Sequence, residues 1–198
     1  MLFIIGITGG TGAGKTATLR VLKSLGALTL DCDAIYHELL SDNTQLKAEI
    51  GSRFDGVLLN GEIDRKRLGE IVFNNSSALL ELNTITHKYV STEIERRIAE
   101  WAACGGTVAA IDAIALIESG VTEKCDVVIG VIAQKETRIS RIVNRDKITR
   151  EQAEMRINAQ KPDIYYKENC DYILENNYKT PKIFKEKTKE FFVELLKI

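Results

Sequence analysis

Residues 9–16, GGTGAGKT, decide the fold class of this 198-residue chain. They match the phosphate-binding loop pattern, in which a glycine and four free positions precede Gly-Lys-Thr. An apolar run at residues 2–5 predicts a buried strand before the loop, and residues 16–25 predict a helix after it. Glycines at positions 9, 10, 12 and 14 permit positive φ angles and remove side chains that would keep a phosphate away from the backbone. The loop amides are then expected to point inward at a helix N-terminus, which favours an anion.

The loop pattern also predicts how its residues contact a nucleotide. We expect Lys15 to reach the β- and γ-phosphates of a nucleoside triphosphate and the Thr16 hydroxyl to bind Mg²⁺. The spacing excludes the dinucleotide pattern GxGxxG, because its third glycine would fall on Lys15. The alternative is a glycine-rich turn without a ligand, which the strand–loop–helix context disfavours.

Length and composition are those of an ordinary globular domain. The chain is 44% hydrophobic and 28% charged, and its net charge of −1 gives no general signal for nucleic acid or a membrane surface. The apolar start is too short for a signal peptide or a membrane span, and the first strand uses it. The four cysteines lack the paired short spacings of zinc or redox sites, so we expect reduced thiols in a cytoplasmic protein.

Five apolar runs without polar alternation predict strands buried on both faces, as in a parallel sheet covered by helices. These runs are Leu2–Ile7, Ala27–Asp31, Val108–Asp112, Val127–Ile132 and Asp171–Leu174. Helical patterns lie between them, and an amphipathic helix is expected at residues 181–197. The prediction is therefore a three-layer α/β/α sandwich with a five-stranded parallel sheet, the architecture of P-loop NTPases, in a single domain over residues 1–198.

Two intervals are longer than a crossover helix needs and predict inserted lobes. The first covers about residues 40–104 and is expected to be helical, with a helix start at Asp64 and with Ile63 and Leu68 as a hydrophobic staple. The second covers about residues 136–169 and is expected to hold two charged helices. This plan is that of a small phosphotransferase, in which the first lobe holds the acceptor and the second closes over the nucleotide as a lid.

Asp31 and Asp33 follow the second predicted strand, at the edge where open parallel sheets bind ligands. In phosphoryl transfer to an alcohol, a carboxylate accepts the hydroxyl proton and orients the attacking oxygen. We assign that role to Asp33. For Asp31, capping of the following helix and a part in catalysis both stay open. Asp112, at the end of the third strand, either accepts a hydrogen bond from a magnesium-bound water or caps a turn.

Arginines mark one stripe of the helix that begins the second insertion. Arg138, Arg141 and Arg145 fall at i, i+3 and i+7, and a capping box at Thr149 and Gln152 starts the next helix. Arg156 and Gln160 follow on one face of that helix. Such a stripe suits a lid that clamps a triphosphate, although arginines on a helix often form only a solvated surface.

Seven segments in order give the chain its resemblance to a family. They are TGGTGAGKT at the start, LDCDAI at residues 30–35, GEIDRKRLGEIVF at 61–73, ITHKYV at 85–90, IDAIALIESG at 111–120, RIVNRDKITREQAEMRINAQ at 141–160 and CDYILENN at 170–177. Together they cover nearly the whole chain, which resembles the dephospho-coenzyme A kinases. The loop alone is shared by many enzymes, whereas the arginine-rich lid motif is far more specific.

The resemblance implies transfer of the ATP γ-phosphate to the 3′-hydroxyl of dephospho-coenzyme A, the last step of coenzyme A biosynthesis. ATP and dephospho-coenzyme A would be the substrates and Mg²⁺ the metal, held by Thr16; Lys15 would act on the phosphates, Asp33 would be the base, and Arg141 and Arg145 would be lid groups. The residues expected to contact ATP are Gly9, Thr11, Gly12, Ala13, Gly14, Lys15, Thr16 and Ala17. The chain departs from the family pattern at Lys88, Ile114 and Tyr178, the first two on the acceptor side and the third near the adenine.

Two other functions fit parts of the sequence. The chain could be another small-molecule P-loop kinase, of the nucleoside monophosphate or shikimate type, although the large first lobe and the lid motif favour a bulky acceptor. A nucleotide-dependent switch is less favoured, since the Asn-Lys-x-Asp motif of guanine recognition is absent. The oligomeric state cannot be inferred from these patterns.

Overall fold

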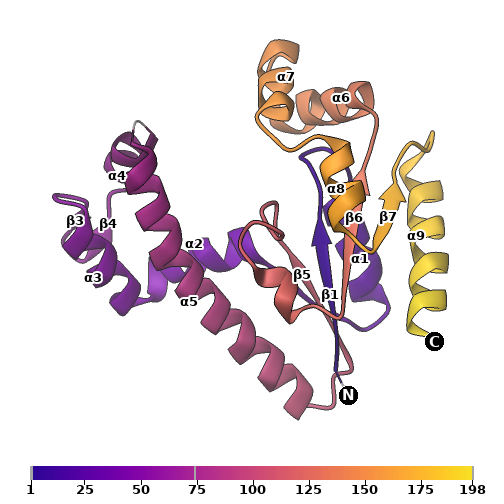
Figure 1. Cartoon of the computed structure of the whole chain (residues 1–198), viewed down its shortest axis with the longest axis horizontal. Helices are drawn as coiled ribbons and strands as arrows, with labels where there is room; N and C mark the ends of the chain where they lie inside the picture. The colour runs from indigo at the N-terminus through magenta and orange to yellow at the C-terminus, as the bar shows by residue number, and fades with distance from the viewer. Residues whose placement is uncertain (1, 74, 198) are drawn as a thin grey trace. The chain divides into compact units, whose positions relative to one another are not determined.

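The computed structural model describes residues 2–73 and 75–197 (Figure 1). Its contacts divide the chain into two compact units. The first, which we call the nucleotide unit, comprises residues 2–30 and 101–197, and the second, the helical unit, comprises Asp31–Glu100. Each is described by itself below.

A five-stranded parallel sheet carries the nucleotide unit, with the strand order β2-β5-β1-β6-β7. Its strands are β1 (Phe3–Thr8), β2 (Leu28–Asp31), β5 (Val108–Asp112), β6 (Val127–Ile132) and β7 (Tyr172–Glu175). All five predicted strands are confirmed, with bounds that shift by at most one residue. The central strand β1 pairs with β5 and β6, so Ile7 lies beside Asp112 and Thr8 beside Gly130 at the edge where the loop leaves the sheet.

Helices cover both faces of this sheet. Helices α1 (Lys15–Ser24) and α9 (Pro181–Leu196) contact each other and share a core with one face. That core includes Ile5, Ile7, Val21, Leu22, Ile129, Val131, Phe184 and Phe192, all at most 2% exposed. On the other side, α8 (Asp163–Asn169) contacts β6 and β7, and the 3₁₀ helix η1 (Val121–Lys124) contacts β1. The predicted α/β fold is confirmed.

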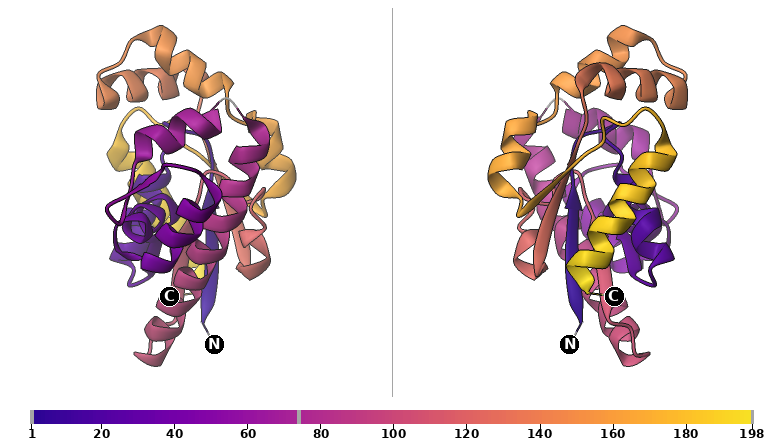
Figure 2. Two further views of the ribbon diagram at one scale, coloured as in Figure 1. Left: turned by 90° about the vertical axis from the view of Figure 1, so that its left-hand side faces the viewer. Right: turned by 90° about the vertical axis from the view of Figure 1, so that its right-hand side faces the viewer.

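Helices α6 (Lys135–Asp146) and α7 (Arg150–Asn158) lie together beyond the carboxyl ends of the strands (Figure 2). They share a small core of Ile139, Ile142, Ala153 and Ile157. The predicted capping box is present, because the Thr149 side chain accepts from the Gln152 amide and the Gln152 side chain accepts from the Thr149 amide.

The prediction of two helices over residues 136–169 is wrong in number, because the interval contains a third helix, α8. Tyr166 of α8 is 2% exposed, and a Cβ atom added at Gly130 of β6 would lie 3.3 Å from the Tyr166 Cβ. The helix therefore packs against the sheet as the crossover between β6 and β7. Its seven residues are too few to show a separate helical period in the sequence.

The helical unit contains α2 (Cys32–Asp42), α3 (Thr44–Arg53), α4 (Arg65–Phe73), most of α5 (Ser76–Ala103) and a hairpin of β3 (Leu58–Leu59) and β4 (Glu62–Ile63). Its core includes Leu46, Ile50, Val57, Leu68 and Ile85. The helix start at Asp64 is confirmed, since Asp64 Oδ1 accepts from the amides of Lys66 and Arg67 at 3.1 and 3.0 Å. The hairpin was not predicted, because strands of two residues show no alternation.

Within the part of the chain that the structure describes, no helix is both long enough and apolar enough to cross a lipid bilayer.

Candidate active site

The phosphate-binding loop connects β1 to α1, as the sequence predicts. Gly14 is the residue before α1 and has a φ of 125°, which an L side chain rarely adopts. A Cβ atom there would also lie 2.3 Å from Asn176 Nδ2. The glycine is therefore required both by the backbone turn into the helix and by the approach of the segment after β7.

The loop carbonyls are held from outside by side chains of α6 and of the segment after β7. Arg141 Nη1 donates to the carbonyls of Gly12 and Ala13, at 3.1 and 3.2 Å. Asn176 Nδ2 also donates to the Ala13 carbonyl, at 2.8 Å, and Arg141 Nη2 donates to Asn176 Oδ1 at 3.0 Å. In a trans peptide the next N–H points opposite to the carbonyl, so fixing the Ala13 carbonyl directs the Gly14 amide the other way. This is the arrangement of an anion-binding loop.

Lys15 and Thr16 begin α1, in the positions that the motif requires. The Lys15 ammonium donates to the Gly9 carbonyl at 3.0 Å and so lies folded over the loop. The Thr16 side chain is exposed, and a hydroxyl at the first turn of this helix fits Mg²⁺, which prefers oxygen ligands and is commonly shared with substrate phosphates. Among residues 2–73 and 75–197, no group of three or more His, Cys, Asp and Glu side chains is placed to hold a metal ion.

The amides of the predicted ATP contacts differ in what they already bind. The Ala13 amide donates to Gly10 at 3.2 Å, and the Ala17 amide donates to Gly14 at 3.0 Å. The Thr11 amide donates to Gln160 Oε1 at 2.8 Å. The Thr11 hydroxyl lies 3.4 Å from Nη2 of Arg145, one of the predicted lid arginines.

A carboxylate holds two arginines of the α6–α7 hairpin. Asp146 lies 2.7 Å from Arg145 Nε and 2.7 Å from Arg156 Nη1. The hydrogen bond from Arg145, with the charges of both arginines, holds the pKa of the Asp146 carboxyl below its ordinary value. The same pair raises the pKa of Arg145. Two cations are thereby kept next to each other on the α6–α7 hairpin.

Arg141, which contacts the loop carbonyls, is partly buried, and this burial changes its pKa. It lowers the pKa of Arg141 below its ordinary value, although an arginine stays protonated in proteins. The structure thus brings Lys15, Arg141 and Arg145 around the loop of the nucleotide unit. This concentration of positive charge suits a polyphosphate.

Asp31 and Asp33 belong to the helical unit and have different environments. Asp31 is the N-cap of α2: its Oδ1 accepts from the amides of Asp33 and Ala34, at 2.9 and 3.1 Å. The capping role predicted as one alternative for Asp31 is therefore confirmed. Asp33 is exposed on the first turn of α2, one turn before His37, whose Nδ1 lies 3.4 Å from Arg65 Nη1.

Asp112 ends β5 and is 8% exposed. Its register partner Ile7 lies two residues before the loop, so the carboxylate is at the edge of the sheet where the nucleotide is expected. This position is compatible with both of its predicted roles. Close by, Thr8 Oγ1 donates to the carbonyl of Ile114, one of the three departures from the family pattern, at 3.2 Å.

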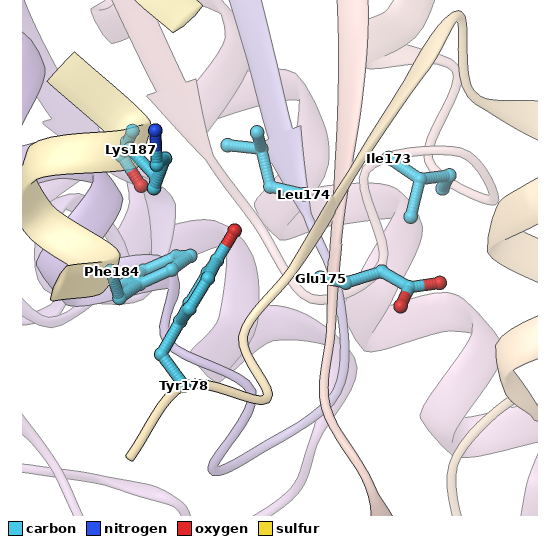
Figure 3. Close-up of a pocket in the computed structure, with 7 residues that line it drawn as sticks. Ile173, Leu174, Glu175, Tyr178, Phe184 and Lys187 are labelled. Atoms are coloured by element: carbon cyan, nitrogen blue, oxygen red, sulfur yellow. The ribbon is translucent and has the colours of Figure 1, made fainter. Parts of the chain in front are cut away.

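A pocket of about 320 Å³ lies between β7 and α9 (Figure 3). Tyr178 and Phe184 lie next to each other on one side of it, with ring centroids 6.2 Å apart. None of the predicted site residues lines this pocket. The departure at Tyr178 therefore places an aromatic side chain against α9, where the ring packs on Phe184.

Three further residues, which were not among the predicted site residues, contact the backbone of the loop. They are Arg138, Gln160 and Asn176. Each had a signal in the sequence. Arg138 is one turn before Arg141 on the same stripe, Gln160 ends the lid motif, and Asn176 lies in the segment CDYILENN. What the sequence could not show is that all three contact the loop backbone.

Comparison with known proteins identifies the family. The model of the dephospho-CoA kinase family matches residues 3–182. The dephospho-CoA kinase of Geobacter sulfurreducens is 37% identical over 193 residues, which are 96% of this chain and 98% of that protein. The solved dephospho-CoA kinase of Campylobacter jejuni is 29% identical, with a TM-score of 0.71 over 98% of both chains.

A more distant likeness concerns the fold alone. Shikimate kinase from Acinetobacter baumannii is 17% identical, with a TM-score of 0.56 over 100% of this chain and 94% of that one. Because the family match spans nearly the whole chain and includes both the loop and the lid motif, it favours the bulky acceptor over shikimate. The chain belongs to the dephospho-CoA kinase family, ATP-dependent phosphotransferases that carry out the final step of coenzyme A biosynthesis.

Proposed function

We propose that this chain transfers the ATP γ-phosphate to the 3′-hydroxyl of dephospho-coenzyme A on the loop of residues 9–17. The observation that carries the proposal is the loop itself, whose carbonyls are held by Arg141 and Asn176 so that its amides are directed towards one side. Those amides and the Lys15 ammonium would bind the β- and γ-phosphates. The hydroxyl of Thr16 would hold Mg²⁺, which neutralises phosphate charge when bound.

Asp33 is the proposed base. It would accept the proton of the 3′-hydroxyl while that oxygen forms a bond to the γ-phosphorus and the bond from the γ-phosphorus to the bridging oxygen of ADP breaks. ADP then leaves with the electron pair of the broken bond. One observation supports Asp33 over Asp31: both residues are exposed, but Asp31 Oδ1 is engaged with two helix amides. The helical lobe, about residues 40–104, would receive the rest of the acceptor.

Arg141 and Arg145 are proposed to stabilise the phosphate charge that develops during transfer. Arg145 is paired with Asp146 and contacts the Thr11 hydroxyl, so a small movement of the hairpin would bring it to a bound phosphate. Arg141 already contacts the loop and would act from there. Within the predicted lid of about residues 136–169, helices α6 and α7 would then close over ATP, while α8 stays packed against the sheet.

The proposed location is the cytoplasm. Its support is chemical: Cys104, Cys125 and Cys170 carry free thiols. Burial raises the pKa of Cys125 and Cys170 to about 11, which keeps both in the less reactive thiol form.

One assay tests the proposed reaction. ADP release is measured with ATP and Mg²⁺, without an acceptor and with dephospho-coenzyme A, shikimate or a nucleoside monophosphate in turn. We expect release only with dephospho-coenzyme A, and none after chelation of Mg²⁺. Turnover of shikimate or a monophosphate in its place would contradict the proposed acceptor. ADP release at the same rate with and without any acceptor would favour a nucleotide switch.

A further inference from the structure

Arg138 and Gln160 hold both backbone groups of Thr11, a residue in the middle of the phosphate-binding loop. Arg138 Nε donates to the Thr11 carbonyl at 2.9 Å, and the Thr11 amide donates to Gln160 Oε1 at 2.8 Å. Arg138 Nη2 donates to the same Gln160 oxygen, also at 2.8 Å. The three groups form a closed set of hydrogen bonds that ties the loop to the start of α6 and to the segment just after α7, and we call it the Thr11 clasp.

The space around Gly10 shows how closely the clasp meets the loop. Gly10 is the one loop glycine of the sequence motif whose φ is not positive, so its backbone would accept another residue. A Cβ atom there would nevertheless lie 2.2 Å from Arg138 Nη2 and 3.0 Å from Gln160 Oε1. Another residue at this position would have to displace the Arg138 guanidinium, whereas the backbone turn itself does not call for glycine.

The Arg138 side chain is buried, with 5% of its surface exposed. Burial lowers its pKa below the ordinary value, and the carboxylate of Asp163, 3.7 Å from Nη1, acts against this effect. A buried cation of this kind stabilises a fold less than a well-packed apolar side chain often would. The presence of an arginine at this buried position is therefore explained better by its directed hydrogen bonds than by a contribution to the stability of the fold.

The direction of those bonds matters for the nucleotide. The peptide bond after Thr11 is trans, so holding the Thr11 carbonyl on the side of α6 directs the Gly12 amide to the opposite side. Arg141 and Asn176 do the same for Gly14 through the Ala13 carbonyl. Donors fixed before the ligand arrives bind more tightly, because no ordering cost remains at binding.

We propose that Arg138 is a positioning residue for ATP: with Gln160, it holds Thr11 so that the Gly12 amide is set towards the phosphates before nucleotide binds. The proposal rests on the ATP site proposed above. It requires no contact between Arg138 and the nucleotide. Its signature is a change in ATP binding that leaves the binding of the acceptor unaffected.

The test compares Arg138→Met and Gln160→Met, which remove the hydrogen bonds and keep similar volume, with Gln160→Glu, which keeps an acceptor oxygen for both donors. For the two Met variants we expect the KM for ATP to rise about 10- to 100-fold, since each lost bond to a charged or buried group is worth about one to two powers of ten. The KM for dephospho-coenzyme A should stay within about twofold of the original. Gln160→Glu should recover most of the ATP affinity.

Arg150→Met is the matched control. Arg150 also lies on the α6–α7 hairpin, but it pairs with Glu136 and Glu154 and its side chain is 53% exposed. Its loss should leave the KM for ATP unchanged. If Arg138→Met and Gln160→Met only lower the melting temperature and leave this KM unchanged, Arg138 is merely structural and the proposal is overturned.

Calorimetric titration of ADP into the unliganded variants separates this proposal from the proposed reaction. Weaker ADP binding by Arg138→Met or Gln160→Met supports the Thr11 clasp even if the wild-type chain fails to phosphorylate dephospho-coenzyme A. If both variants bind ADP as tightly as the wild type, the proposed positioning role of the Thr11 clasp is overturned and the kinase assignment is unaffected. If Arg138→Met does not fold, Gln160→Met and Gln160→Glu still decide the question.

Discussion

At the start of α2, two carboxylates that are two residues apart occupy different environments. Both are exposed, but Asp31 accepts two amide hydrogen bonds and so stabilises the first turn of the helix, on which Asp33 lies. Asparagine and aspartate are nearly equivalent at an N-cap, because both present a side-chain oxygen to the helix amides. They are not equivalent as bases, since an amide cannot accept a proton from an alcohol.

Asp33→Asn is therefore expected to lower kcat by about 10²- to 10⁴-fold, the usual contribution of a general base. The KM for ATP should change little, because the substitution alters no group of the loop. Steady-state kinetics with both substrates measures the effect. Asp31→Asn is the matched control and should stay within about threefold of the wild-type kcat, since the cap is retained. If both variants keep the wild-type kcat, Asp33 is not the base.

At the scale of one element, the second half of α5 carries a charged cluster centred on Glu93. Its Oε1 lies 2.7 Å from Arg96 Nη2 and 2.7 Å from Arg97 Nε. The hydrogen bond from Arg96, assisted by Arg97 and by the charges of both, lowers the pKa of Glu93 to about 2. A carboxylate whose pKa is lower in the folded state stabilises the fold above its unfolded pKa, about 4.3, and this contribution is lost as the pH falls towards the folded value.

Glu93→Gln is expected to destabilise the protein near neutral pH, and the difference from the wild type should shrink between about pH 4 and about pH 2. Urea unfolding followed by circular dichroism over this range gives the two free energies of unfolding. The same substitution in an Arg96→Met, Arg97→Met background is the control, where the pH-dependent difference should be largely absent. A difference that is constant with pH in the original background would contradict the assignment.

The elements also show which parts of the fold a sequence can predict. The five strands were predicted because each is largely an apolar run. The inner strands β1, β5 and β6 are mostly buried in the structure, whereas the edge strands β2 and β7 are only partly buried, so the prediction of burial on both faces is wrong for these two. The β3–β4 hairpin and α8 were missed because two or seven residues give too little periodicity, and their positions depend on packing with distant segments.

The site divides in the same way. Lys15 and Thr16 were predicted because the loop motif is local and its spacing determines their roles. The Thr11 clasp was not, because its hydrogen bonds join residues 149 and 127 positions apart in the chain. In the sequence, Arg138 and Gln160 look like parts of an ordinary solvated helix surface. In the structure Gln160 lies just after the end of α7, and only the folded contacts reveal its role.

At the scale of the whole molecule, the chain divides into two units, each with its own core. The loop and the arginines that contact it belong to the nucleotide unit, and Asp33 belongs to the helical unit. A ligand stabilises the segments that it contacts and slows their local opening, so two ligands with separate sites leave separate patterns of amide hydrogen exchange. Donor and acceptor can therefore be assigned to units without any measurement of catalysis.

We expect ADP with Mg²⁺ to slow exchange at residues 9–17 and along α6 and α7, and dephospho-coenzyme A to slow exchange at the start of α2 and in the lobe of about residues 40–104. Hydrogen exchange with mass spectrometry, on the free chain and with each ligand alone, makes the comparison. Lys15→Ala is the control for the nucleotide: it should remove the protection by ADP, because the loop loses its main cation, and keep the protection by dephospho-coenzyme A. If dephospho-coenzyme A protected only the loop, the helical lobe would not be the acceptor site, and the base would have to be sought in the nucleotide unit, where Asp112 is the carboxylate nearest to the loop along the strand register.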